Sequence, residues 1–100
     1  MEIKKEWEGK TLTMRLSGRL DAVTAMQFDK AWKESMEEAK TLIVDMSDLV
    51  YVASAGLRSL MMTQKKMDQK GGSMKILHVQ PQVMEVFRLT GFDEFLTIEE

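Results

Sequence analysis

The chain of 100 residues contains no cysteine, so disulfides and thiolate metal sites are excluded. A histidine-based metal site needs several histidine ligands, and the chain has only His78. No apolar run reaches the length of a membrane-spanning helix, and the first six residues are mostly charged where a signal peptide would be apolar. We therefore expect a cytoplasmic protein with no metal, no cofactor and no membrane-inserted segment.

An excess of one charge is also lacking. The 14 basic and 16 acidic residues are mixed along the chain and give a formal net charge of −2. A protein that binds nucleic acid directly would present a basic face, so this balance argues against one. The length suits one domain over residues 1–100, and 44% hydrophobic residues are enough for a single core.

Apolar periodicity predicts a chain that alternates strands and helices. Strands are predicted over residues 3–7, 12–16, 41–45, 74–79 and 96–98, and helices over 24–39, 55–70 and 81–90. Thr24 and Gln27 have the spacing of a capping box, and Pro81 suits the first position of a helix. The order β-β-α-β-α-β-α contains βαβ crossovers, which give parallel strands. We expect one open, mixed, mostly parallel sheet of four to five strands, packed by three to four helices, with its first strand antiparallel.

Residues 45–57 are the most informative stretch. An apolar run at 50–52 leads into a turn of small residues, and helical periodicity begins at once. Ser54 stands where a helix N-cap is expected, with Ala53, Ala55 and Gly56 leaving little bulk around its hydroxyl. A serine in this setting can be a passive cap, a nucleophile or a phosphorylation site.

Catalysis by Ser54 has weak support. A serine nucleophile needs a histidine base within hydrogen-bond reach, and His78 is the only histidine. Val52 stands where a nucleophile elbow has glycine, and neither GxxxxGK[ST] nor GxGxxG occurs. We expect His78 to make a local hydrogen bond at the end of its strand, and we assign no catalytic residue.

Phosphorylation is the physically consistent alternative to a passive cap. A phosphate adds about −1.5 to −2 charges, at a point where unpaired backbone N–H groups can receive them. Arg58, one helical turn along, would partly neutralise the group or else be a solvated helix residue. Asp21 and Asp45 would either contribute to the same surface or act only as loop caps. From the residues alone, the cap and the switch remain equally open.

Five segments, in order and with matching spacing, resemble the STAS domains, named for sulfate transporters and anti-sigma factor antagonists. These segments are Ser-Gly-Arg-Leu-Asp at 17–21, Leu-Ile-Val-Asp-Met-Ser-Asp-Leu-Val-Tyr at 42–51, Ser-Ala-Gly-Leu at 54–57, the glycine pair at 71–72, and Thr-Gly-Phe-Asp-Glu-Phe at 90–95. The resemblance covers nearly the whole chain.

The resemblance implies a partner-switching regulator of the anti-sigma factor antagonist type, without catalytic activity. Soluble members bind an anti-sigma factor that is also a serine kinase; it phosphorylates the loop serine and ends the interaction, and a PP2C-type phosphatase restores it. By position the phosphorylated residue is Ser54. The predicted partner-binding residues are Asp21, Asp45, Ser54, Ala55, Gly56, Leu57 and Arg58.

One departure from the family pattern concerns the residue before the serine. The family usually has Asp there, and this chain has Ala53. Some STAS domains act instead as unphosphorylated scaffold subunits of larger complexes, including lipid-transport and stress-signalling assemblies. That role is the alternative implied by the resemblance.

Overall fold

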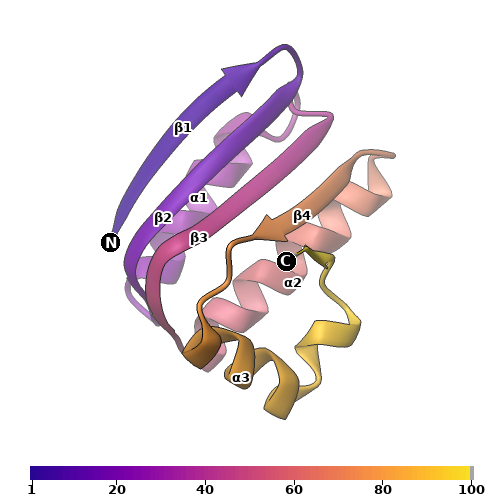
Figure 1. The fold of residues 1–100 in the computed structure, drawn as a ribbon. Coiled ribbons are helices and arrows are strands. Elements are labelled where there is room, and N and C mark those ends of the chain that lie inside the picture. The colour runs from indigo at the N-terminus through magenta and orange to yellow at the C-terminus, as the bar shows by residue number, and fades with distance from the viewer. Residues whose placement is uncertain (100) are drawn as a thin grey trace.

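The computed structural model describes residues 1–99, which form one five-stranded sheet with helices packed against it (Figure 1). The elements are β1 (Glu2–Glu8), β2 (Thr11–Leu20), α1 (Thr24–Ser35), β3 (Thr41–Val52), α2 (Ser54–Gln69), β4 (Ser73–Leu77), α3 (Pro81–Thr90), the 3₁₀ turn η1 (Phe92–Glu94) and β5 (Ile98–Glu99). The strands lie side by side in chain order; β1 is antiparallel to β2 and the other pairs are parallel. The predicted fold class is confirmed.

The core lies between the sheet and helices α1 and α2, which Figure 1 shows side by side behind the strands. Leu12, Met14 and Leu16 of β2 are fully buried, at every second position, as expected for a strand with one covered face. Phe28 and Trp32 of α1 pack into the same core. In Figure 1, α3 lies at the end of the sheet to which the arrows of β3 and β4 point.

Strand β3 is longer than predicted, because it continues to Val52 instead of ending at Asp45. Likewise β2 runs to Leu20, beyond the predicted end at residue 16. The two extensions pair in parallel, with register shifts after Arg15 and after Gly18 that mark irregularities in the ladder. The apolar run at 50–52 is therefore the second half of the same strand, and it carries the chain to the Ser54 turn.

Helix ends also differ from the prediction at two points in α1. Helix α1 ends at Ser35, and the ammonium of Lys70 donates hydrogen bonds to the carbonyls of Met36 and Ala39 just beyond it. The predicted capping box is wrong, since the side chain of Gln27 donates to the Met1 carbonyl instead. Pro81 does occupy the first turn of α3, as predicted.

Strand β4 ends earlier than predicted, and β5 begins later than predicted. Strand β4 ends at Leu77 because His78 adopts a left-handed backbone with φ of 59°. Strand β5 begins at Ile98, while Leu96 is buried in the core. Within residues 1–99, none of the helices is long and apolar enough to cross a membrane.

Candidate functional site

Ser54 is the first residue of α2, not its N-cap. Ala53 holds the N-cap position with an extended backbone, and its carbonyl accepts the first helical hydrogen bond from the Leu57 N–H at 3.0 Å. The predicted N-cap is therefore wrong by one residue. The Ser54 side chain is exposed, and its hydroxyl makes no hydrogen bond to another residue that the structure describes. The presence of serine at position 54 is therefore not explained by a capping hydrogen bond.

The turn that presents Ser54 is fixed against β2. The Ala53 N–H donates to the Leu20 carbonyl at 2.9 Å. A Cβ on Gly56 would lie 2.7 Å from that same carbonyl oxygen and 3.0 Å from Val52 Cγ2, so only glycine fits. The start of α2 is therefore rigidly placed at the ends of β2 and β3, with its first N–H groups unpaired within the helix.

The remaining residues of the predicted site divide between interior and surface. Leu57 is 4% exposed and belongs to the core, and Gly56 is buried. Ala55 is half-buried, while Arg58 is exposed four residues after Ser54, one turn along the helix. Of the segment 54–58, only Ser54, Arg58 and part of Ala55 are available to a partner.

Asp21 closes the N-terminus of α1. Its Oδ1 accepts hydrogen bonds from the N–H groups of Val23 and Thr24, both at 3.1 Å. The Thr24 hydroxyl donates to the Arg19 carbonyl at 2.7 Å and fixes the same turn. The bond from the Thr24 N–H is the main cause that lowers the pKa of Asp21 below its ordinary value. Asp21 therefore acts as the loop cap that the sequence left as one of two alternatives.

Asp45 of β3 is buried, with 6% of its surface exposed, and it contacts β2 and the turn that follows β4. Its carboxylate lies 3.4 Å from Arg15 Nε and 3.3 Å from His78 Nδ1, and it accepts the Ser47 N–H at 2.9 Å. Burial acts to raise the pKa of Asp45, but the Ser47 and His78 contacts outweigh it, and the pKa is lowered. Because a strand rises about 3.3 Å per residue, Asp45 is on the order of 20 Å from the Ser54 turn. The structure does not bring the two residues together.

Exposed apolar side chains near Ser54 were missed by the sequence analysis. Val23 and Met26, at the start of α1, are 72% and 67% exposed. Val50 and Tyr51 are also exposed at the end of β3, where Arg19 lies over the Tyr51 ring at 4.0 Å from its centre. The exposure of Met26 could have been predicted, because this residue lies outside the apolar stripe by which α1 packs on the core. Val23 and Met26 follow Leu20, whose carbonyl accepts the Ala53 N–H, and Val50 and Tyr51 directly precede the turn in β3. We call these four exposed side chains, which belong to the segments that flank the turn, the apolar rim.

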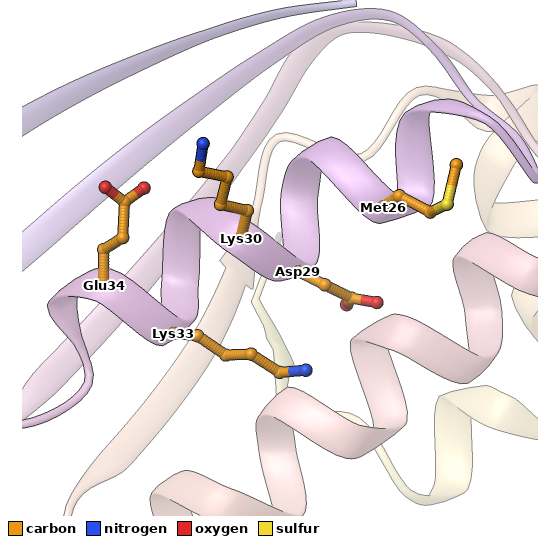
Figure 2. Close-up of a pocket in the computed structure, with 5 residues that line it drawn as sticks. All are labelled: Met26, Asp29, Lys30, Lys33 and Glu34. Atoms are coloured by element: carbon orange, nitrogen blue, oxygen red, sulfur yellow. The ribbon is translucent and has the colours of Figure 1, made fainter.

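An open hollow of about 640 Å³ continues from Met26 along α1 (Figure 2). Figure 2 shows that its residues all come from this helix, with Asp29 and Lys33 extending toward α2. Charges of both signs line it, together with the single apolar side chain of Met26. The hollow is a shallow surface along α1 and not an enclosed substrate pocket.

A catalytic arrangement does not form around Ser54 in the part of the chain that the structure describes. His78 follows the last residue of β4, and its Nδ1 lies 3.3 Å from Asp45 of the neighbouring strand β3 instead of making a contact within its own segment. Across residues 1–99, no group of three histidine, aspartate or glutamate side chains is arranged to hold a metal ion. The site is a rigid, partly apolar corner with one exposed hydroxyl.

Comparison with known protein families identifies the family of the chain. Residues 3–98 match the family described as "Mlab, STAS domain". The chain belongs to the STAS domain family. The resemblance recognised in the sequence is thereby confirmed over almost the full chain.

Relatives in curated proteins carry the name that the resemblance predicted. The anti-sigma F factor antagonist of Paenibacillus polymyxa is 28% identical over 98% of this chain and 86% of its own length. BtrV of Bordetella bronchiseptica, a candidate anti-sigma factor antagonist, is 32% identical over 74% of this chain, and the match spans 58% of its length. This STAS domain is therefore similar to proteins named for antagonism of anti-sigma factors.

Solved structures show the same fold. The anti-sigma factor antagonist SpoIIAA in its unphosphorylated form superposes with a TM-score of 0.84 at 20% identity, covering 99% of this chain and 89% of SpoIIAA. Its phosphorylated form gives a TM-score of 0.77 at 19% identity, covering 99% and 92%. A phosphorylated state is thus known for a domain of this fold.

Proposed function

We propose that this STAS domain is an anti-sigma factor antagonist that switches partners through phosphorylation of Ser54. The observation that carries the proposal is the Ser54 hydroxyl, which is exposed and without a hydrogen bond to a described residue at the open N-terminus of α2. The partner is an anti-sigma factor with serine kinase activity, and a PP2C-type phosphatase reverses the modification. The protein performs no turnover itself and works in the cytoplasm.

The folded domain tolerates a phosphate at this position for a physical reason. The N-terminus of a helix carries about half a positive charge, and its first N–H groups lack acceptors within the helix. Helix α2 has no acidic residue in its first turn and no side-chain cap. A phosphate on Ser54 supplies the missing anion, and Arg58 one turn along is a further cation. Phosphorylation therefore changes the surface without unfolding the domain.

The same phosphate ends partner binding because of what surrounds it. The rim of Val23, Met26, Val50 and Tyr51 is apolar and exposed, which is typical of a docking surface. A doubly charged group placed inside such a contact must lose its water, at a cost of several kcal/mol. Unphosphorylated Ser54, with its small neutral hydroxyl, imposes no such penalty. The switch is thus the arrival of a charge in an apolar contact.

The proposal is tested by incubating the protein with its anti-sigma factor kinase and ATP, followed by peptide mapping. Phosphate is expected on Ser54 and absent in Ser54→Ala. Ser54→Asp should weaken the complex, whereas Ser54→Ala should preserve it. Ser73→Asp, which places the same charge on an exposed serine at the start of β4, is the matched control and should bind normally.

One observation favours a second function. Ala53 stands where the family usually has Asp, and this removes a charge next to the acceptor serine. The protein would then be an unphosphorylated scaffold subunit of a larger complex. In that case the complex forms, Ser54 remains unmodified after incubation with the kinase, and Ser54→Asp leaves binding unchanged.

A further inference from the structure

A second hollow lies at the carboxyl ends of β4 and β5, against α3. Its volume is about 360 Å³, and its lining residues are His78, Val79, Pro81, Met84, Arg88 and Glu99. This volume falls in the range of small-molecule pockets. Open α/β sheets bind their ligands outside the carboxyl ends of the strands. None of the residues of the Ser54 turn lines the pocket, so we treat it as a second candidate site.

The pocket combines an apolar wall with an unbalanced positive charge. Val79, Pro81 and Met84 provide the apolar surface. The carboxylate of Glu99 is already held at 3.2 Å by Lys75 Nζ. Among residues 1–99, no carboxylate lies within ion-pair distance of Arg88. The guanidinium of Arg88 is thus available to an anion.

His78, another residue that lines the pocket, is held in a fixed position. Its backbone has φ of 59°, and its Nδ1 lies 3.3 Å from the buried carboxylate of Asp45. Gln80, two residues on, donates its side-chain amide to the Ser47 carbonyl at 2.5 Å. These contacts order the β4–α3 turn in advance, which lowers the entropy cost of binding. They also leave Nε2 as the ring nitrogen that a ligand can reach.

We propose that this pocket binds a small carboxylate that carries a short apolar tail. The carboxylate pairs with the guanidinium of Arg88, for which a bidentate geometry is favourable, and lies toward His78 Nε2. The tail packs on Val79, Pro81 and Met84. Because the pocket is small and open to solvent, the affinity is modest, with a dissociation constant on the order of 1–10 mM for an eight-atom ligand.

Hexanoate is the probe, followed by amide chemical shifts in the full chain. We expect a saturable shift confined to residues 78–88 and 98–99. Acetate has the charge without the tail, and 1-hexanol has the tail without the charge; each should bind at least about tenfold more weakly. Arg88→Gln should weaken hexanoate about tenfold, while Arg58→Gln on α2 is the matched control and should leave binding unchanged.

The proposal is overturned if hexanoate causes no saturable shift, if shifts scatter over the whole chain, or if 1-hexanol binds as tightly as hexanoate. Equal binding by Arg88→Gln, with its melting temperature unchanged, would also overturn it. Ser54→Asp should bind hexanoate like the unmodified chain, because Ser54 does not line the pocket. Failure here therefore leaves the proposed switch intact, and failure of the switch leaves the pocket intact.

Discussion

The N-termini of α1 and α2 solve the same physical problem in opposite ways. Both begin at the ends of β2 and β3, and both present N–H groups that lack acceptors within the helix. At α1, the carboxylate of Asp21 accepts the N–H groups of Val23 and Thr24. At α2, Ala53 provides no side-chain acceptor, and the exposed Ser54 follows. One helix start is closed by a built-in anion, and the other is left open for one that arrives by modification.

This difference explains why Ser54 suits a reversible switch. In this chain Ala53 contributes no carboxylate next to Ser54, so a phosphate on Ser54 would be the first anion at the start of α2. The position of the first turn of α2 against β2, which we call the seat of α2, is nevertheless fixed, since Gly56 packs directly on the backbone of Leu20. An open helix start on a rigid seat accepts charge while the fold stays in place. Because the apolar rim forms the proposed contact with the partner, a charge placed there must lose its water, and partner binding is weakened.

The largest predicted effect comes from disturbing the seat of α2. Gly56→Ala places a Cβ within 2.7 Å of the Leu20 carbonyl oxygen, so α2 must move away from β2. We expect the free energy of unfolding to fall by about 2–3 kcal/mol and partner binding to weaken, measured by urea denaturation and titration. Ser54→Ala is the control and should change the free energy of unfolding by less than about 0.5 kcal/mol. An unchanged stability of Gly56→Ala would contradict the close packing.

Next in size is the removal of the closed cap of α1. Asp21→Ala leaves the N–H groups of Val23 and Thr24 without their acceptor, and the melting temperature at pH 7 should fall by about 5 °C. The pKa of Asp21 is lowered in the folded state, so its stabilisation is present above the ordinary value of 3.8 and is lost as the pH falls through the lower folded value. The difference between Asp21→Ala and the unmodified chain should therefore shrink in acid. Asp48→Ala, an exposed aspartate of β3, is the control.

The smallest effect comes from closing the open start of α2. Ala53→Asp gives α2 the acceptor that α1 already has, on a backbone that is already extended at φ −101°. We expect the free energy of unfolding to rise by about 0.5–1 kcal/mol, less so in high salt. If Ala53→Asp gives no gain, then the N–H groups of α2 are satisfied by some other means, and the contrast between the two helices is smaller than described.

Much of the fold could be predicted because its signals are local. Alternation in β2, the apolar runs of β3 and β4, and Pro81 each report on their own neighbourhood. The assignment of caps failed because a cap depends on backbone position to within one residue. Thr24 and Gln27 matched a capping pattern, yet Asp21, three residues earlier, supplies the acceptor. Ser54 matched an N-cap, yet Ala53 is the N-cap and Ser54 is already the first residue of α2.

The candidate site was only partly predictable for a similar reason. Ser54 and Arg58 were found from the turn and helical spacing, and both are exposed. Asp45 was placed at this corner because a short strand was expected, and the continuation of β3 to Val52 moves it away. The apolar rim depends on which side chains the tertiary packing leaves uncovered. Periodicity within one helix does not supply that information.

The most direct test measures the affinity of the anti-sigma factor partner for the same chain with and without phosphate on Ser54, by calorimetric titration. The predicted result is a loss of at least about 100-fold in affinity, which corresponds to about 2.7 kcal/mol, with a melting temperature changed by only a few degrees. Equal affinity for the two forms would contradict the switch. A phosphorylated chain that unfolds would contradict the open, receptive start of α2.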